Sequence, residues 1–438
     1  MAELKQIARR IFAETLAAID IPATMSRKLA CIGTRIQCGE SGVDLAAYER
    51  IVAVAVGKAG YAMASGLCDV LAPDFQVSGI LAIPSAPPRE LPGFKTFLAG
   101  HPVPNAASLE AGRVALDLLA GCAERTLVFF LLSGGGSALF ESPLDPNVTL
   151  EDIQQLNHAL VTCGAPIDEM NAVRKHLSAV KGGRLAAAAP RAMKITLGVT
   201  DVPAGRESAL ASGPTLPDPT TVQDASRVVE QYGLLEKLPP VLQAKFARRH
   251  SSLPETPKAN DPAFKRAQFQ LLLDMHDLFH HAHRAAEAAG FVTVCDNSTD
   301  DWPLERAADF LLERLEQLKR ENPGRPVCWI ADGEVICPVT GNGVGGRNSA
   351  FALYCVEKIA GKGIAVLSAG TDGVDGNSPA SGAVADGDSL ARARAAKLDP
   401  ADYRCRSDAY TFFQKLGDAV LTGPTGNNLR DLRIFLHA

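Results

Sequence analysis

The sequence is short of aromatic side chains, of net positive charge and of long apolar stretches. Aromatic residues make up 6% of its 438 residues and the net charge is −5, so it offers neither a base-stacking surface nor a basic field for nucleic acid. No apolar segment approaches the length of a membrane span. None of the ten cysteines forms a CxxC pair, and we expect reduced thiols in a cytoplasmic protein.

Several catalytic signatures are also missing. The chain has no GxxxxGKS phosphate-binding loop, no protein-kinase motifs, no HExxH zinc motif and no GxSxG nucleophile turn. His276, His280 and His283 fall on one face of an expected helix, but no cysteine or suitably spaced carboxylate accompanies them. Zinc binding is therefore disfavoured and the role of these histidines stays open. The first residues predict an amphipathic helix rather than a signal peptide.

An apolar run over 127–132 leads directly into a turn of three glycines flanked by serines. The run is typical of a strand buried on both faces of a sheet. Three successive residues without a Cβ let backbone N–H groups converge on a ligand, and the serines add hydroxyl donors. This favours binding of phosphate or carboxylate oxygens over a plain strand-to-helix turn. The predicted anion-binding residues are Ser133, Gly134, Gly135, Gly136 and Ser137.

Strands and helices alternate along the chain, which predicts an α/β fold with a mainly parallel sheet covered by helices on both faces. A polar, proline-bearing segment at 251–262 is typical of a linker. We therefore predict domains at 1–250 and 263–438, with the option that the tail of the chain packs back on the first domain. Glycine-rich and charged loops occur at strand ends in both halves, so the site is expected in a cleft between the domains.

Two polar residues follow buried strands of the first half. Lys58 leaves one strand beside glycine and Asp201 ends another, and ligands of open α/β sheets bind at that carboxyl edge. Lysine there suits a substrate carboxylate or a transferring phosphoryl group, with a structural lysine as the alternative. The segment 171–186 predicts a basic helix that carries Lys175 and Lys181. Lys175 is a candidate cofactor contact, and a solvated basic helix is the alternative.

The second half carries two glycine-rich loops. Residues 341–346 satisfy GxGxxG before a helix, but the acidic residue of a dinucleotide site is missing at the required spacing. Arg347 follows this loop directly, which favours a phosphate or carboxylate ligand. Asp372 and Asp375 stand among glycines at a strand end, a pattern that indicates a cation site more than a plain turn.

These candidates share one chemistry, phosphoryl transfer, which needs anion-cradling amides, cations on developing charge and carboxylates that hold magnesium. A hairpin expected around residues 332–333 delivers Glu334 as one such carboxylate, close to its turn. Composition and spacing alone predict no more than a cleft that binds a small anionic substrate. The full set comprises Lys58, the glycine turn, Asp201, Glu334, Arg347 and Asp372.

Seven motifs follow one another along nearly the whole chain: AVGKAG, LLSGGGSALF, NAVRKHLSAVKGGRLA, SGPTLPDPTT, GGRNSAFAL, GTDGVDG and TGPTGNNLRDLRI. In these motifs and their order the chain resembles the MOFRL-type glycerate 2-kinases. The resemblance implies a Rossmann-like N-terminal domain and a smaller α/β C-terminal domain, with the MOFRL region near 325–435. It also implies transfer of the γ-phosphate of ATP, with Mg²⁺, to the 2-hydroxyl of D-glycerate, and it makes Lys58 and Arg347 the essential cations.

On this hypothesis the carboxylates take the remaining roles. We expect Asp201 to orient the metal or the attacking hydroxyl, and Asp372 and Asp375 to hold magnesium with it. Asn427, in the last motif, is expected to contribute to cofactor binding together with Lys175 and Glu334. The expected partners are D-glycerate and ATP, without nucleic acid or membrane, in a monomer or a homodimer.

The chain also departs from the family pattern. Where the family often reads GRGGRNQE, this chain has Val344, Ser349 and Ala350, so it lacks an arginine and a carboxylate beside Arg347. Nucleotide preference and metal binding near that helix therefore stay open. Two other functions remain as alternatives: an NAD(P)H-dependent hydroxypyruvate reductase, and a non-catalytic sensor of hydroxy acids.

Overall fold

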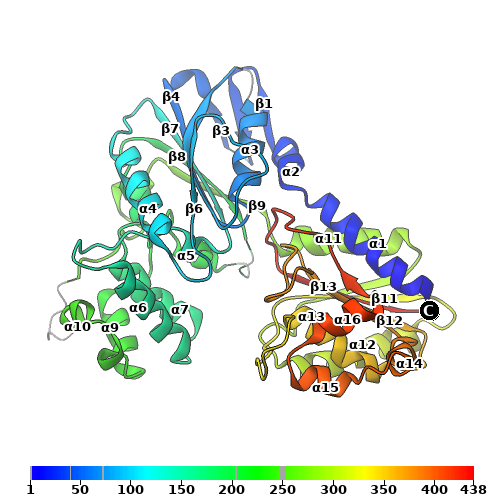
Figure 1. Ribbon diagram of the computed structural model, residues 1–438. Coiled ribbons are helices and arrows are strands. Elements are labelled where there is room, and N and C mark those ends of the chain that lie inside the picture. The colour runs from blue at the N-terminus through cyan, green and yellow to red at the C-terminus, as the bar shows by residue number, and fades with distance from the viewer. Residues whose placement is uncertain (1, 40, 72–73, 201, 203–204, 247–252) are drawn as a thin grey trace. The chain divides into compact units, whose positions relative to one another are not determined.

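The computed structural model describes residues 2–39, 41–71, 74–200, 202, 205–246 and 253–438. The chain forms two compact units, one of residues 21–272 and one of residues 1–20 with 273–438 (Figure 1). These units differ from the expected ranges, because the first 20 residues join the C-terminal half. Their helix α1 (Ala2–Ala18) packs against helix α11 and strands β12 and β13 of that half.

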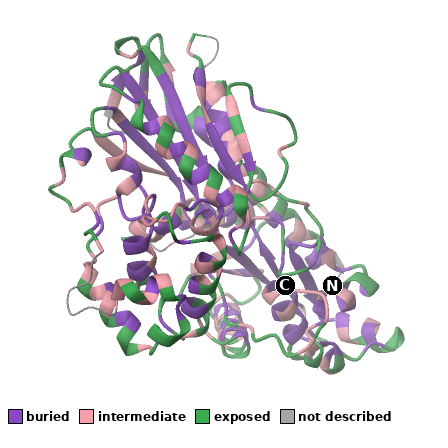
Figure 2. Ribbon diagram, turned by 60° about the vertical axis from the view of Figure 1, so that its left-hand side comes forward, coloured by how far each residue is buried: buried purple, intermediate pink, exposed green. Residues whose placement is uncertain are grey.

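The first unit, residues 21–272, is built on a six-stranded sheet in the order β6-β5-β4-β7-β8-β9. Strands β6, β5, β4, β7 and β8 pair in parallel, as the alternation of strands and helices predicts. β4 and β7 are its central strands and are buried almost throughout (Figure 2). The strands are β4 Arg50–Val56, β5 Val77–Ile83, β6 Phe94–Leu98, β7 Thr126–Ser133, β8 Met193–Val199 and β9 Ala267–Leu273.

Helices and a small sheet complete this unit. Strands β1 Leu29–Ile32, β2 Arg35–Cys38 and β3 Ser41–Asp44 form an antiparallel sheet that the sequence did not reveal. Helices α6, α7, α9 and α10 enclose an apolar core of their own beside the large sheet. The helices are α2 Ile21–Lys28, α3 Gly60–Leu71, α4 Ala106–Ala120, α5 Gly136–Leu139, α6 Leu150–Thr162, α7 Ile167–Leu177, α8 Arg184–Ala187, α9 Val222–Gln231 and α10 Pro240–Phe246.

The helix expected over 171–186 is wrong in its second half. α7 ends at Leu177, and the chain then runs through non-helical backbone to the four-residue helix α8. Ser178, directly after α7, is already extended, and Gly182 and Gly183, with φ of +57° and +81°, have the left-handed conformation that glycine adopts without strain. Lys181 therefore does not share a helix with Lys175.

The second unit is built on a mixed sheet in the order β10-β11-β15-β12-β13-β14. β10 and β11 are parallel, whereas β15 runs antiparallel to both of its neighbours, β11 and β12. β11 and β12 therefore point the same way on either side of β15. The strands are β10 Val292–Asp296, β11 Val327–Asp332, β12 Ile364–Gly370, β13 Gly382–Asp386, β14 Ala419–Val420 and β15 Asp431–His437.

Helices cover both faces of this sheet. α1 and α11 contact each other and one face, while α12 and α13 pack together with the apolar cluster of the other face. The tail of the chain, which ends in β15, is an internal strand of this sheet. The helices are α11 Met275–Ala288, α12 Leu304–Glu321, α13 Arg347–Lys358, α14 Ser389–Ala395, α15 Pro400–Cys405 and α16 Ala409–Leu416.

The hairpin expected around residues 332–333 is wrong. β11 ends at Asp332, and its partners are β10 and β15 rather than the residues that follow it. Gly333 has φ of +98°, and a Cβ there would lie 2.7 Å from Asp300 Oδ1, so the turn that follows β11 requires glycine at this point. Glu334 is therefore at a strand-end turn, as expected, but not in a hairpin.

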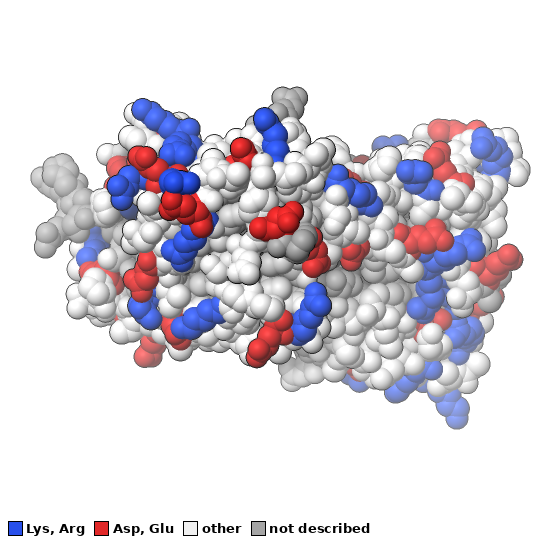
Figure 3. Space-filling view, turned by 90° about the horizontal axis from the view of Figure 1, so that it is seen from above, with Lys and Arg blue, Asp and Glu red and all other residues white. Residues whose placement is uncertain are grey.

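Charged side chains on the surface follow no single sign. On the face in Figure 3, lysine and arginine side chains lie among aspartate and glutamate side chains over both ends of the view. None of the helices in the described part of the chain combines the length and the apolarity needed to cross a bilayer.

Candidate functional site

In the first unit, two neighbouring parallel strands bring Lys58 to the glycine turn. β4 and β7 end side by side, since Val56 pairs with Leu132. The backbone N–H of Lys58 donates to the carbonyl of Gly134 at 3.0 Å. The next N–H, of Ala59, donates to Ser133 Oγ at 2.9 Å. The two loops are thus joined at the carboxyl edge of the sheet, as the sequence predicted, and α3 begins directly after them.

Two positions of this junction require a residue without a side chain. Gly57 has φ of +120°, and a Cβ there would lie 2.2 Å from Ser133 Oγ. Gly135 has φ of +83°, and a Cβ there would approach the ring of His101 and the side chain of Lys58. Both the turn and the close approach therefore require glycine. His101 is a neighbour of the turn that no sequence motif indicated.

The two serines that flank the glycines differ in role. Ser133 is fully buried, and its hydroxyl accepts from Ala59 N–H and donates to the carbonyl of Val56 at 3.4 Å. Ser133 thus connects the two loops, and these contacts do not support the expected ligand contact of its hydroxyl. Ser137 is partly exposed, and its Oγ lies 2.8 Å from Ser212 Oγ.

Ser212 belongs to a strained segment behind the turn. Ala211 and Ser212 have φ of 50° and 61°, values that non-glycine residues adopt at a cost and often at functional sites. Ser212 Oγ donates to Asn171 Oδ1 at 3.0 Å, and a Cβ at Gly136 would lie 2.6 Å from Ala211 Cβ. Asn171, on α7, thereby supports the glycine turn through Ser212.

Lys175 is held away from solvent by a carboxylate. Its Nζ lies 3.2 Å from Asp218 Oδ1, and both side chains are almost fully buried. Asp218 also accepts hydrogen bonds from Thr220 and Thr256. Burial raises the pKa of Asp218, but the charge of Lys175 and these hydrogen bonds outweigh it and lower the pKa below its usual range. This geometry gives Lys175 a structural ion pair in place of an evident cofactor contact.

Lys181, which lies near the glycine turn, is likewise buried and paired with a carboxylate. It is 1% exposed, and its Nζ donates to the carbonyl of Phe140 and pairs with Glu141. Glu141 Oε1 in turn accepts from Ser178 Oγ at 2.5 Å. Because Phe140 and Glu141 follow α5 directly, this buried cluster anchors the end of the glycine turn's short helix.

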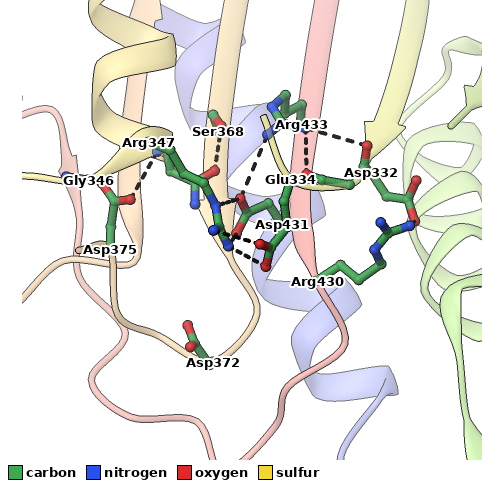
Figure 4. Close-up of polar contacts among 12 residues, drawn as sticks. Asp332, Glu334, Gly346, Arg347, Ser368, Asp372, Asp375, Arg430, Asp431 and Arg433 are labelled. Atoms are coloured by element: carbon green, nitrogen blue, oxygen red, sulfur yellow. Dashed lines mark hydrogen bonds and ion pairs between the residues drawn. The ribbon is translucent and has the colours of Figure 1, made fainter. Parts of the chain in front are cut away.

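In the second unit, Arg347 is the first residue of α13 and lies at the edge where β11 and β12 end and β15 begins (Figure 4). Two carboxylates hold its guanidinium. Nε donates to Asp431 Oδ2 at 2.5 Å, while Nη1 and Nη2 donate to Glu334 at 2.8 and 2.6 Å. Burial alone lowers the pKa of Arg347, but Asp431 and Glu334 raise it well above its usual value. Arg347 and Glu334, both predicted site residues, are therefore in direct contact.

Two further arginines enter this cluster from the strand segment that carries Asp431. Arg430 pairs with Asp300 and lies 3.4 Å from Asp332, and Arg433 is fully buried with its Nη2 3.7 Å from Asp431. The sequence analysis missed this network. Its signal was the pattern LRDLR at 429–433, which places charges inside an otherwise apolar strand.

Asp375 anchors the start of α13. Its carboxylate accepts from the backbone N–H groups of Gly346, Asn348 and Ser349 at 2.8 to 3.1 Å, and from Ser349 Oγ at 2.5 Å. Burial raises its pKa. These contacts use the carboxylate as a helix cap, so metal binding by Asp375 loses its support. Ser349, a departure from the family pattern, contributes two of these bonds, one from its N–H and one from its hydroxyl.

Asp372 lies earlier in the same loop, partly exposed and apart from the contacts of Arg347 (Figure 4). Its Oδ1 accepts from the N–H of Val374 at 3.1 Å. No group of three or more histidine, cysteine, aspartate or glutamate side chains is arranged to hold a metal ion among the residues that the structure describes. Asp201, the third expected metal ligand, lies outside the described residues.

Asn427 connects distant parts of the second unit. Its Nδ2 donates to the carbonyl of Ile19 at 2.7 Å, and its Oδ1 accepts from the N–H of Asn428. Ile19 follows α1, so the Asn427 amide attaches the N-terminal helix to the segment before β15. Its expected role in cofactor binding stays a prediction, for which these contacts add no support.

The GxGxxG loop at 341–346 does not follow a strand, and its amides are already bonded within the protein. The N–H groups of Gly343, Val344 and Gly345 donate to the Arg406 carbonyl, Asp408 Oδ1 and Asn377 Oδ1 respectively. A dinucleotide site needs such amides for the pyrophosphate. The loop therefore does not have the arrangement of a dinucleotide site, as the missing acidic residue had indicated.

The protein has an α/β fold, and in each of its two units a cluster of polar and charged residues lies at the ends of the sheet strands. Two family models match the chain: a domain of unknown function, DUF4147, over residues 7–247, and the MOFRL family over residues 327–431. The chain is 36% identical over 391 residues to the D-glycerate 2-kinase of Thermotoga maritima, covering 89% of this chain and 91% of that protein. The chain belongs to the MOFRL-type glycerate 2-kinase family.

Other relatives and solved structures agree with this assignment. The glycerate 2-kinase of Pyrococcus horikoshii is 31% identical, and the alignment covers 99% of this chain and 97% of that protein. The crystal structure of glycerate kinase from Thermotoga maritima superposes with a TM-score of 0.83 at 33% identity over the whole of both chains. The expected α/β architecture is thereby confirmed, while the expected cleft between domains stays a prediction.

Proposed function

We propose that this protein transfers the γ-phosphoryl group of ATP to the 2-hydroxyl of D-glycerate, giving 2-phosphoglycerate. Relatives named glycerate 2-kinase or glycerate kinase, at 30% to 36% identity over most of the chain, support phosphorylation of glycerate. The observation that carries the proposal is the junction of Lys58 with the Gly134–Gly136 turn at the ends of β4 and β7. A cation beside backbone amides is suited to an anionic substrate.

In the first unit, Lys58 supplies positive charge at the glycine turn. The ammonium neutralises substrate or phosphoryl oxygens, while the Gly57 and Gly135 conformations keep the backbone close to the ligand. Ser137, as the partly exposed hydroxyl of the turn, is the serine that can reach a ligand. Asp201 keeps its predicted role of orienting the attacking hydroxyl or the metal.

In the second unit, Arg347 supplies a guanidinium for a phosphoryl or carboxylate group. Its bidentate contact with Glu334 supports this role, because guanidinium nitrogens bind carboxylate and phosphate groups in the same two-pronged way. Glu334 is the half-exposed partner in this contact. An anionic substrate group competes with Glu334 for the same two nitrogens.

Magnesium fits the residues present to a limited extent. Mg²⁺ in kinases is held by one or two carboxylates together with water and phosphate oxygens, so a cage of three protein ligands is not required. Asp372 offers one partly exposed carboxylate, whereas Asp375 is occupied as a helix cap. When bound with ATP, the ion neutralises charge on the phosphates. We further propose a cytoplasmic monomer or homodimer.

The product distinguishes this activity from phosphorylation at the 3-hydroxyl. With D-glycerate, ATP and enolase, phosphoenolpyruvate should form at once, because enolase accepts 2-phosphoglycerate. Formation only after a phosphoglycerate mutase is added would contradict the proposal and identify the 3-hydroxyl as the acceptor.

The role of Lys58 is tested with a matched surface lysine. Lys58→Ala should lower kcat by about 10²- to 10³-fold, the scale of removing a charge-stabilising group. Lys95→Ala, which removes an exposed lysine paired with Glu110 in the same unit, should leave kcat unchanged. Thermal unfolding of both variants checks the fold. Equal kcat in the two variants would contradict a function for Lys58 in the reaction.

A reductase remains a second candidate, because two relatives from Agrobacterium vitis carry a hydroxypyruvate reductase name at 36% and 37% identity. The bonded amides of the 341–346 loop argue against a nicotinamide site there. Absorbance of NADH or NADPH with hydroxypyruvate should stay constant. A non-catalytic sensor would show ligand-induced thermal stabilisation with no turnover of any nucleotide.

A further inference from the structure

The two carboxylates that hold Arg347 use different edges of its guanidinium. Asp431 takes the side edge, with Nε at 2.5 Å from Oδ2 and Nη2 at 3.3 Å from Oδ1. Glu334 takes the end, with Nη1 and Nη2 at 2.8 and 2.6 Å. Because Nη2 carries two hydrogens, both contacts form at once (Figure 4). Asp431 thus holds the side edge and Glu334 the end edge.

The surroundings of the two carboxylates also differ. The Asp431 side chain is 4% exposed. Asp431 is the first residue of β15 and pairs in register with Gly370 at the end of β12. The Glu334 side chain is 49% exposed and lies beyond the end of β11. Asp431 is thus fixed by the sheet, whereas Glu334 stands on a turn in contact with solvent.

A second arginine, Arg433, lies close to Asp431. It is fully buried two residues along the same strand, with Nη2 3.7 Å from Asp431 Oδ2, and its Nη1 donates to the carbonyl of Gly333 at 2.9 Å. Burial raises the pKa of Asp431, but the charges of Arg347 and Arg433 outweigh it and lower the pKa. A buried carboxylate with a lowered pKa therefore contacts the guanidinium of Arg347.

We propose that Asp431 is the positioning residue of Arg347: it fixes the side edge of the guanidinium, so that the two terminal nitrogens face the anion that displaces Glu334. This inference rests on the proposed function, in which Arg347 acts on a phosphoryl or carboxylate group. Asp431 itself does not touch the substrate. Its contribution lies in orientation, and a misplacement of about 1 Å in a catalytic group can cost about 10²-fold in rate.

The first test compares two buried aspartates of the same unit. Asp431→Asn replaces one acceptor oxygen with an amide that repels the guanidinium, and should lower kcat for D-glycerate phosphorylation by about 10- to 100-fold. Asp418→Asn is the matched control, because Asp418 is equally buried and paired with Lys5 and Arg392 away from Arg347. Its kcat should stay within about twofold of the unmutated protein, with a comparable fall in the unfolding midpoint.

The second test isolates positioning from stability by chemical rescue. Arg347→Ala should lose activity and regain part of it when guanidinium ion is added well below denaturing concentrations, because the free ion occupies the vacated site. In the double variant Arg347→Ala, Asp431→Asn, guanidinium should restore none of the activity. A purely structural Asp431 would leave the rescue per folded molecule unchanged.

The outcomes separate this inference from the proposed function. Rescue of equal size in the single and double variants, or a kcat of Asp431→Asn equal to that of Asp418→Asn, overturns the positioning role while the kinase activity stands. Full activity of Arg347→Ala overturns the role of Arg347 and the inference with it. Absence of glycerate phosphorylation in the unmutated protein overturns the proposed function itself.

Discussion

Replacing Asp332 by asparagine should change how stability depends on pH. As pH rises from acidic to neutral, the unfolding free energy of the variant should increase relative to that of the unmutated protein. Asp332 is fully buried at the end of β11, and its Oδ1 has no hydrogen-bond partner among the described residues. Arg430 lies 3.4 Å from the other oxygen and shares its charge with Asp300, while Arg433 contacts the Asp332 carbonyl. Burial raises the pKa of Asp332 to about 6, an effect that Arg430 offsets only in part.

The magnitude follows from the difference between the folded and unfolded pKa values. An increase from 3.8 to about 6 corresponds to roughly 3 kcal/mol at the usual conversion. Between these pH values the folded state binds more protons at Asp332 than the unfolded state does, so the unfolding free energy falls as pH rises. The stability contributed by protonated Asp332 is complete below about pH 4 and is lost above about pH 6. Asparagine has no such titration.

The assay is urea-induced unfolding of the Asp332→Asn and unmutated proteins at about pH 4 and about pH 7.5, a range chosen to bracket both pKa values. The stability difference should shift in favour of the variant by about 3 kcal/mol between the two pH values. Asp309→Asn, at a half-exposed carboxylate of α12 paired with Lys358, is the control and should shift by less than about 1 kcal/mol. A difference that is constant with pH, or that shifts the other way, would refute a raised pKa.

Two further substitutions test the supports of the fold. Gly57→Ala should abolish turnover and destabilise the first unit by about 3 kcal/mol or more, because its Cβ would lie 2.2 Å from Ser133 Oγ at a φ of +120°. Calorimetry and the enolase-coupled assay measure both effects, and an active, stable variant would show that the junction can relax. Lys5→Ala removes a buried ammonium that lies 3.1 Å from Asp418 and 3.5 Å from Asp386, and should cost about 3 to 5 kcal/mol in urea unfolding. A loss below about 1 kcal/mol would contradict the ion pair's role.

The buried strands of the first unit could be predicted because their apolar character is local. The apolar run at 127–132, expected as a buried strand, lies within β7. Continuous β-branched and aromatic runs are typical of strands covered on both faces. The parallel pairing could be predicted from the alternation of strands and helices, since parallel neighbours need crossover connections between them.

The second sheet could not be predicted in the same way, because its central strand comes from the end of the chain. β15 inserts between β11 and β12, more than 60 residues away along the sequence from β12. Nothing in the 327–339 segment distinguishes a strand with this distant partner from a strand that turns back in a hairpin. The α1 helix illustrates the same limit, since its partners β12 and β13 lie at the other end of the sequence.

The same limit applies to the site residues, because the sequence shows the type of each residue but not its partner. A carboxylate among glycines suits a cation, but it equally suits the unpaired N–H groups at a helix start, because both present positive charge to its oxygens. Asp375 has the second partner in α13, and Asp431 has a guanidinium. Both are buried, so each must find its counter-charge within the protein. Asp372, partly exposed in the same loop as Asp375, stays a predicted metal ligand. The residue types alone could not show that Asp375 and Asp431 have their partners within the protein.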